Sequence, residues 1–421
     1  MPSPKKSPLW GTNPHPLLTL DEAWDCIAHA VSHLDPVPIS TEQSLGRVLA
    51  APVPATDDYP IFDKSMMDGF AVRSADCQNP VTELKLAGVI AAGVTEKTTL
   101  PPGNAVRINT GAPIPAGADS IVRIENTTLS PDGLRVTIRN VVKPGAHLTR
   151  RGQHARRGDI LLAPPLLIEA PQIAVLTSNG TTNVSVYPDI DVGIAVTGDE
   201  LVPSGAPRAH GQIFESNGPM LAALVTQFGA TPHSVGIVRD NPADLRSKLT
   251  SALRHPVVIA AGGMSLGTLD LVPNAFADLG VEWQFHGVQV RPGKPVAYGR
   301  GPNGQHVFGL PGNPVSAYVC AWLFVRMAIR GLQGHAVRPP HRWKAMLTRE
   351  VKAAKDNRPA FVPARVWNTD ADGLVVEPCG WGGSGDPFGA ALANALLVRN
   401  DPTLVQTPGC QVEVIFISKE M

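Results

Sequence analysis

The sequence is short of several features that define common classes of protein. Its 421 residues carry 36 basic and 36 acidic side chains, so no net charge draws it to nucleic acid or to an anionic membrane surface. Aromatic residues make up only 5%, which leaves few platforms on which bases could stack. The composition therefore predicts neither nucleic acid nor a membrane as a partner.

Cysteine and long apolar runs are scarce as well. The five cysteines form no C-x-x-C pair, which argues against a disulfide framework and a Cys-His zinc set. Lys5 and Lys6 are followed by no apolar segment, so we expect no signal peptide. The longest apolar run, 315–325, is too short to span a bilayer. These absences favour a reduced, cytoplasmic setting.

Metal-binding histidine spacing occurs once and is unconvincing. His29 and His33 lie four residues apart on an expected helix that opens with the capping box Thr19 and Glu22. No Glu follows the first histidine, so we interpret the pair as surface or packed side chains. No Walker loop is present.

What the sequence does contain is a regular alternation of strands and helices from about residue 190 to 331. Such alternation predicts a doubly wound parallel sheet, and hence an α/β fold class. The expected strands are 190–197, 235–239, 257–261, 281–290 and 307–310, and the expected helices are 216–228, 242–253, 270–279 and 314–331.

Both flanks of this region have another pattern. Residues 61–150 show short alternating segments between turn signals, which predicts a small β-rich domain, and a helix is expected over 170–178. Beyond Pro339 and Pro340 alternation returns and predicts a C-terminal β domain. The whole chain is therefore expected to be a multidomain α/β protein.

The strand 257–261 breaks into a glycine loop, Gly262-Gly263-Met264-Ser265-Leu266-Gly267, which is followed by Asp270. In a parallel sheet such a loop lies outside the carboxyl end of its strand, where ligands bind and where backbone N–H groups can approach an anion. An ordinary glycine turn is the alternative interpretation.

Three further loops are expected at the same edge of the sheet: 197–201, 291–295 and 311–314. Asn313 and Pro314 are suited to the N-cap and first position of a helix, whose free N–H groups favour anions. Arg291 and Lys294 add positive charge. Carboxylates among them would repel a phosphate unless a divalent cation such as Mg²⁺ intervened, so they suggest a metal–phosphate ligand. Alternatively, Glu200 and Asp270 only cap helices.

Six motifs in order carry a family resemblance. They are Ser65-Met-Met-Asp-Gly-Phe-Ala-Val-Arg73, the run from Arg107 to Asp119, Thr197-Gly-Asp-Glu-Leu201, Gly262 to Gly267, Arg291-Pro-Gly-Lys-Pro295 and Gly309-Leu-Pro-Gly-Asn-Pro-Val-Ser-Ala317. Together they resemble the molybdopterin molybdenumtransferase family, which includes the E domain of gephyrin. The resemblance spans nearly the whole chain.

The resemblance implies a homodimer of elongated subunits with four domains each. Its αβα molybdopterin-binding domain is expected at 187–337, beside a β-barrel-like C-terminal domain at 338–421. A small β-rich domain is expected at 59–150, and a linker domain at 15–58 with 151–186. The site would lie between the αβα domain of one subunit and the β-rich domain of the other.

The resemblance further implies insertion of molybdate into adenylated molybdopterin, with release of AMP and dependence on Mg²⁺ or another divalent cation. Carried over by motif, the catalytic residues are Asp68, Thr110, Glu200 and Asp270, and the metal ligands are Glu200, Asp240 and Asp270. Residues expected to bind the pterin or the oxyanions are Gly262, Gly263, Ser265, Gly267, Lys294, Pro311, Gly312, Asn313 and Pro314. Expected protein partners are the molybdopterin adenylyltransferase and cofactor-receiving enzymes.

At three positions this chain lacks a charged side chain that members of the family usually carry. Thr268 and Pro273 replace an acidic residue and a lysine, and His154 replaces another acid. These changes leave an alternative open, namely a diverged, non-catalytic relative that binds molybdopterin or the cofactor as a dimeric carrier or scaffold.

Overall fold

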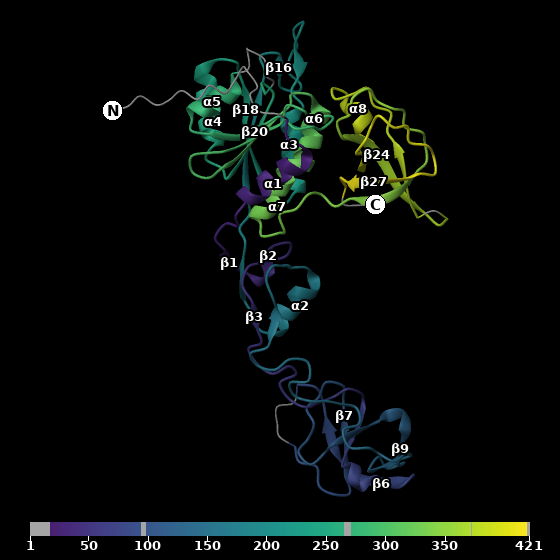
Figure 1. Cartoon of the computed structure of the whole chain (residues 1–421). Coiled ribbons are helices and arrows are strands. Elements are labelled where there is room, and N and C mark those ends of the chain that lie inside the picture. The colour runs from purple at the N-terminus through teal and green to yellow at the C-terminus, as the bar shows by residue number, and fades with distance from the viewer. Residues whose placement is uncertain (1–16, 94–97, 265–270, 372, 419–421) are drawn as a thin grey trace. The chain divides into compact units, whose positions relative to one another are not determined.

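The computed structural model describes residues 17–93, 98–264, 271–371 and 373–418 (Figure 1). The chain divides into two compact units. One contains the first part of the chain, up to Val37, together with everything from Tyr187 onward, and the other contains residues 38–186. The second unit is therefore an insertion in the sequence of the first.

The larger unit is built on a six-stranded sheet with the order β18-β15-β19-β22-β21-β20. The first four strands of this order run parallel, whereas β21 is antiparallel to both of its neighbours. The bounds are β15 (Asp191–Thr197), β18 (Thr231–Val238), β19 (Val257–Ala261), β20 (Glu282–His286), β21 (Ala297–Arg300) and β22 (His306–Leu310).

The strand expected over 281–290 forms, but it is shorter than expected. Strand β20 ends at His286, Gly287 follows with a φ of +93°, and the chain returns as the antiparallel strand β21. Two prolines, Pro292 and Pro295, lie in the connection and cannot donate to a sheet ladder. The connection from 287 to 296 therefore leaves and re-enters the sheet at one edge.

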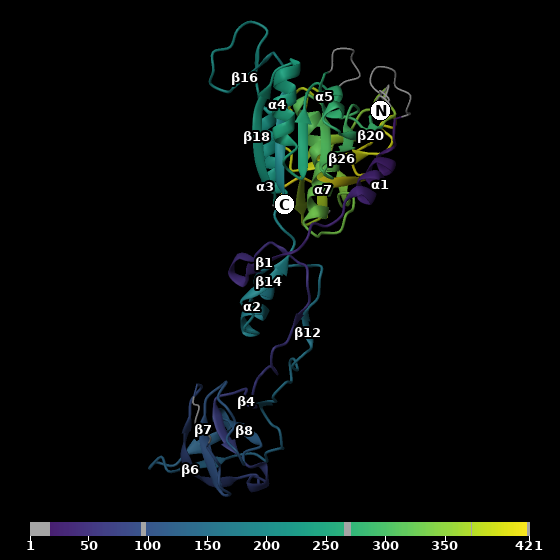
Figure 2. The same ribbon diagram turned by 90° about the vertical axis from the view of Figure 1, so that its left-hand side faces the viewer.

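Helices cover both faces of this sheet and make three layers (Figures 1 and 2). Helices α4 and α5 pack on the face that presents Ala195, Val258 and Ala260, and the opposite face packs on the other helices. The bounds are α1 (Leu20–Ala30), α3 (Asn217–Gln227), α4 (Pro242–Ala252), α5 (Val272–Asp278), α6 (Pro314–Cys320), the π-helical segment η4 (Ala321–Val325) and α7 (Arg326–Leu332); a small parallel pair, β16 (Leu201–Val202) and β17 (Ile213–Phe214), projects beyond β15.

The continuous helix Pro314–Leu332 belongs to the core of the larger unit. It is long and apolar enough to cross a membrane by length and composition, but 83% of its most apolar window is buried within the protein. The indole Nε1 of Trp24, on α1, donates a hydrogen bond of 2.9 Å to the carbonyl of Leu323. Its apolar character is thus explained by packing against the sheet and α1.

The capping box at Thr19 forms as expected and starts α1. Glu22 accepts from the Thr19 amide at 2.7 Å, and the Thr19 hydroxyl accepts from the Glu22 amide at 3.3 Å. The helix ends at Ala30, earlier than expected. His29 and His33 are exposed and bond through Nδ1 to backbone oxygens of Asp25 and Gly331, as expected of surface side chains.

A closed barrel completes the larger unit and confirms the barrel-like C-terminal fold. Its interior is filled by residues such as Ala364, Leu397 and Val414, whereas Phe361, Leu396 and Val398 on its outer face join the same hydrophobic core as the sheet and α1. Its order is β23-β25-β24-β26-β27, with bounds β23 (Trp343–Leu347), β24 (Ala360–Thr369), β25 (Gly373–Pro378), β26 (Ala395–Arg399) and β27 (Gln411–Phe416), and a short helix α8 (Pro387–Ala390) precedes β26.

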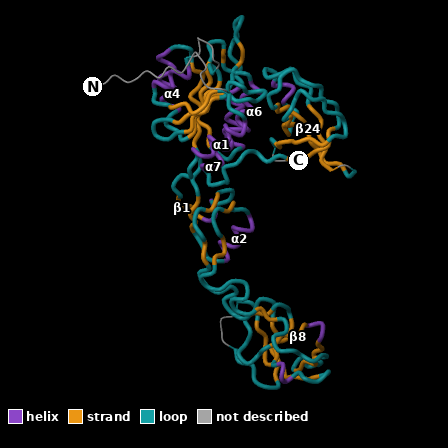
Figure 3. Tube along the Cα trace, in the orientation of Figure 1, coloured by secondary structure: helices purple, strands orange, loops and turns teal. Residues whose placement is uncertain are grey.

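The smaller unit consists mainly of strands and loops, which confirms the expected β-rich region (Figure 3). Its main sheet has the order β8-β5-β7-β6-β10-β9, with bounds β5 (Gly69–Val72), β6 (Thr82–Ile90), β7 (Asn104–Ile108), β8 (Ser120–Arg123), β9 (Thr127–Leu129) and β10 (Arg135–Ile138). A second sheet and two strand pairs contain β1 (Val37–Ser40), β2 (Val48–Leu49), β13 (Leu166–Leu167), β14 (Asn183–Val186), β3 (Val53–Pro54), β12 (Ile160–Leu162), β4 (Lys64–Ser65) and β11 (Leu148–Thr149), beside α2 (Ala170–Ser178) and the 3-10 turns η1 (Thr41–Gln43), η2 (Ser74–Asp76) and η3 (Ile124–Asn126).

Candidate active site

The parallel part of the large sheet has a point at which the strand order reverses. From β15 the chain passes through α3 to β18 on one side, then through α4 to β19 on the other side. Helices α3 and α4 lie on opposite faces of the sheet. In open α/β sheets ligands bind at such a switch point, outside the carboxyl ends of the strands. The loops after β15 and β19 meet there.

The glycines after β19 pack directly onto the end of β15. Gly262 and Gly263 have φ values of +90° and +61°. A Cβ on Gly262 would lie 2.6 Å from the Thr197 carbonyl oxygen, and one on Gly263 would lie 2.9 Å from Thr197 Oγ1. Both the backbone conformation and the space therefore require glycine. Ser265, Gly267, Thr268 and Asp270, also expected here, lie outside the described residues.

Two buried polar atoms beside this loop have no hydrogen-bond partner in the part of the chain that the structure describes. They are Thr197 Oγ1 and Asn217 Oδ1. The Asn217 amide group donates to the Gly312 carbonyl at 2.7 Å, so this side chain joins α3 to the loop after β22. Unsatisfied buried polar atoms are uncommon and occur at functional sites, which favours a ligand site at this edge.

The loop after β22 approaches the glycine loop closely. A Cβ on Gly312 would lie 3.6 Å from the Gly262 Cα. Pro311 is buried, and Pro314 is the first residue of α6. Asn313 occupies the N-cap position, but its amide donates to Ser384 Oγ at 3.0 Å and makes no cap bond. Ser384 also accepts from the Val315 amide through its carbonyl at 3.0 Å.

The predicted carboxylates lie at the ends of neighbouring strands. Glu200 is exposed just after β15, and Asp240 is exposed just after β18. The Asp240 amide donates to Asp199 Oδ1 at 3.2 Å, and the Arg239 guanidinium donates to the carbonyls of Gly198 and Asp199. These bonds hold the two loops together. The described residues of this edge contain no three-ligand cluster, and Asp270 lies outside them.

The connection from β20 to β21 brings Arg291 and Lys294 to the same edge. Gly293 has a φ of +118°, and a Cβ there would lie 2.4 Å from Cys320 Sγ, so α6 holds the loop in place. Lys294 is exposed. The main chain of Arg291 exchanges hydrogen bonds with Pro359 and Phe361 at 2.9 and 2.8 Å, which links this edge to the barrel.

A cleft of about 900 Å³ between the sheet and the barrel was missed by sequence reasoning. Its basic residues, which we call the basic cleft, are Arg291, Arg349, Lys352, Lys355 and Arg399. Two acids, Glu350 and Asp356, also line it, and Asp356 is ion-paired with Arg358, whose hydrogen bonds lower the pKa of Asp356 to about 2. The signal in the sequence is the charge-rich segment 349–358.

The smaller unit brings Asp68 and Thr110 together. The Thr110 amide and hydroxyl donate to Asp68 Oδ1 at 2.7 and 3.0 Å. The hydrogen bond from the Thr110 amide, followed by that from its hydroxyl and by the charge of Arg107, lowers the pKa of the Asp68 carboxyl. Both side chains are exposed. This loop pair therefore presents an ionised carboxylate at neutral pH.

Comparison with known proteins gives consistent matches over nearly the whole chain. Family models match as the MoeA N-terminal region (domain I and II) at residues 18–180, the probable molybdopterin binding domain at 193–331, and the MoeA C-terminal region (domain IV) at 344–417. A molybdopterin molybdenumtransferase of Staphylococcus epidermidis is 34% identical over 90% of this chain and 90% of its own. One from Nostoc is 41% identical over 69% of this chain and 68% of its own.

A solved structure agrees. The molybdopterin biosynthesis MoeA protein from Pyrococcus horikoshii has a TM-score of 0.80 at 27% identity, and the match covers 96% of this chain and 100% of that one. The fold and the switch-point loops thus define a multidomain α/β protein with a molybdopterin-binding domain of this type. The chain belongs to the molybdopterin molybdenumtransferase family.

Proposed function

We propose that this chain inserts molybdate into adenylated molybdopterin and releases AMP, which gives molybdenum cofactor. The observation that carries the proposal is the glycine loop Gly262-Gly263, which packs on Thr197 at the switch point of the domain matching the molybdopterin-binding model. The Gly262 amide donates to the Leu310 carbonyl at 3.1 Å, and neither glycine carries a side chain that would keep a phosphate or molybdate oxyanion away from the backbone of this edge.

Positive groups at the same edge balance the charge of these anions. Lys294 is exposed beside the glycine loops, and the basic cleft carries further cations on the barrel side. Arg399 donates to three backbone carbonyls, those of Lys352, Pro402 and Leu404, so it holds the cleft wall in shape. Arg291, Lys352 and Lys355 are left to contact an anion. We assign molybdate or the pterin phosphate to this side.

Glu200 and Asp240, with Asp270, are proposed to hold the divalent cation. Exposed carboxylate oxygens at adjacent strand ends fit the hard-oxygen preference of Mg²⁺. When bound, the ion would neutralise the oxygens of the pyrophosphate bond that is broken. The chain's own part is to keep both loops in register through the Asp199–Asp240 hydrogen bond.

We further propose a homodimer in which Asp68 and Thr110 of one subunit complete the site on the large unit of the other. The support is family membership, together with the finding that these two exposed residues form a preorganised acid at the surface of the smaller unit. We expect the enzyme in the cytoplasm, where the molybdopterin adenylyltransferase and cofactor-receiving enzymes would be its partners.

The proposal is tested with purified protein, adenylated molybdopterin, molybdate and a divalent cation, with AMP followed by chromatography. Release of AMP that requires both molybdate and the cation is the expected result. Tight binding of the pterin without AMP release would overturn the enzymatic proposal and support a carrier. A parallel assay with a Gly262→Ala variant provides the control for contaminating hydrolases.

A further inference from the structure

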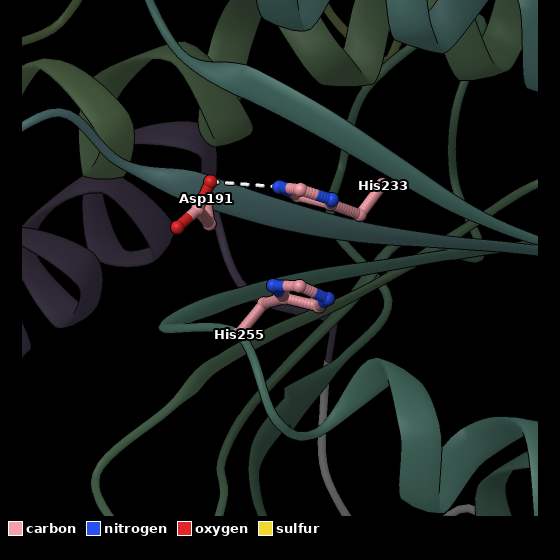
Figure 4. Close-up of side chains that lie close together, drawn as sticks. All are labelled: Asp191, His233 and His255. Atoms are coloured by element: carbon pink, nitrogen blue, oxygen red, sulfur yellow. Dashed lines mark hydrogen bonds and ion pairs between the residues drawn. The ribbon is translucent and has the colours of Figure 1, made fainter.

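Three potential metal ligands meet at the opposite edge of the large sheet. Asp191 is the first residue of β15, His233 lies near the start of β18, and His255 lies two residues before β19 (Figure 4). One ligand atom from each lies within 4.8 Å of the others. Because the parallel strands begin here and end at the candidate active site, this cluster is separate from that site.

The sheet register explains why the cluster forms. Gly193 on β15 pairs with His233 on β18, so His233 points to the same face as Gly193 and Asp191. Gly193 has no side chain to fill the space between them. A Cβ there would lie 3.1 Å from His255 Cδ2 and 2.7 Å from the Ala252 carbonyl oxygen. The glycine thus admits the His255 ring beside His233.

The two rings and the carboxylate lie side by side. His233 Nε2 lies 2.7 Å from Asp191 Oδ1. The His233 and His255 rings stack with centroids 4.4 Å apart and planes within 9° of parallel. Asp191 and His233 are exposed, and His255 lines an open cleft of about 620 Å³. An ion from solvent can therefore reach all three side chains.

Two imidazoles and one carboxylate form a ligand set typical of zinc. Zn²⁺ binds His nitrogen and carboxylate oxygen at about 2.0 to 2.2 Å, so tetrahedral ligands lie about 3.3 Å apart. Metal binding would therefore lengthen the Asp191–His233 contact and turn the two stacked rings so that one nitrogen of each points at the ion.

We propose that Asp191, His233 and His255 bind one divalent transition-metal ion, with Zn²⁺ preferred, leaving a fourth position to water. The bound ion would join β15, β18 and the connection between α4 and β19 at the edge remote from the candidate active site. It differs in chemistry from the oxygen-rich set at Glu200 and Asp240, which suits Mg²⁺.

The test is a Zn²⁺ titration by calorimetry of the full chain after chelator treatment, compared with His233→Ala, His255→Ala and Asp191→Asn. We expect one tight site in the parent chain, and an affinity at least about tenfold weaker in each variant. Zn²⁺ should also raise the Tm of the parent and not that of the double variant His233→Ala/His255→Ala. His210→Ala, which removes an exposed histidine from the loop before β17, is the matched control.

Two outcomes would overturn the proposal. One is an unchanged Zn²⁺ affinity in the His233 and His255 variants. The three residues would then be joined only by the stacking of the two rings and the hydrogen bond between His233 and Asp191. The other is loss of the tight site in Glu200→Gln, which would place the ion at the active-site edge. If an alanine variant fails to fold, His233→Gln keeps the polar contact to Asp191 without a metal-binding imidazole, and the same loss of affinity is expected.

Discussion

Thr110 donates both its backbone amide and its hydroxyl to a single oxygen of Asp68, at 2.7 and 3.0 Å, across 42 residues of sequence. Two donors on one oxygen leave the second carboxylate oxygen open to a ligand. The pair is held by the ends of β5 and β7, which are neighbours in the smaller unit's sheet. This geometry therefore fixes the orientation of the Asp68 carboxylate and leaves it exposed.

Asp68→Asn should lower AMP release by about a hundredfold, because the variant keeps the size of the side chain and removes its charge. Thr110→Val should have a smaller effect and should raise the pKa of Asp68, which carboxyl NMR titration would detect. Asp132→Asn is the control, since Asp132 is another exposed acid that accepts from Ser130 and Leu134 in the same unit. Equal losses in Asp68→Asn and Asp132→Asn would contradict a role for Asp68.

Gly262→Ala should destabilise the larger unit by about 1 to 3 kcal/mol and abolish pterin binding, because the new methyl group meets the Thr197 carbonyl oxygen and φ is positive. Gly211→Ala is the matched variant: its φ is +83°, but nothing lies within 4 Å of the added Cβ. It should cost about 1 kcal/mol and leave binding intact. Urea unfolding and pterin titration measure the two effects.

Glu200→Gln and Asp240→Asn should each remove AMP release at low Mg²⁺ and recover part of it at high Mg²⁺. Both side chains are exposed and not part of a core, so the Tm should stay close to that of the parent. A large drop in Tm without a change in Mg²⁺ dependence would identify these acids as structural.

Mixing Asp68→Asn chains with Glu200→Gln chains should restore activity if the site is shared between subunits. In a mixed dimer one site carries both changes and the other carries neither. After random exchange half of the dimers are mixed, so about a quarter of the parent activity is expected. Activity no higher than that of the separate variants, with dimer exchange shown by mass, would rule out a shared site.

His306 should make the larger unit sensitive to acid. It is buried between Tyr298 and Arg300, and burial, aided by Arg300, lowers its pKa from 6.5 to about 3. The unfolded chain takes up a proton below pH 6.5 that the folded chain resists until about pH 3, so the free energy of unfolding should fall across that window. His306→Gln should flatten the fall in urea unfolding measured against pH. An unchanged slope would contradict this assignment.

The sequence predicts the αβα arrangement well because buried strands such as Val257–Ala261 and prolines at helix starts such as Pro314 are local signals. It fails at Gly287 to Val296, where an antiparallel return depends on pairing with β22 rather than on local pattern. Helix α1 also ends earlier than expected. The backbone is already extended at Val31, and the apolar residues expected to continue the helix pack against the core from this extended segment.

Some residues of the candidate site can also be predicted from the sequence, and others are revealed only by the structure. The motif and the strand pattern predict the loop at Gly262 and Gly263. The reason that these positions require glycine, their close contact with Thr197, is visible only in the structure. Ser384 and the basic cleft come from the barrel, distant in sequence, and no spacing rule joins them to Asn313 or Arg291. Asp191, His233 and His255 are equally invisible in sequence, because three strand starts bring them together.

The bond between Trp24 and Leu323 joins residues 299 apart and spans the whole insertion of residues 38–186. During synthesis the ribosome must release the smaller unit, with a core of its own, long before the partner of α1 exists. The apolar face of α1 can therefore be covered only after the last third of the chain has been synthesised, and chains truncated before residue 314 should leave it exposed.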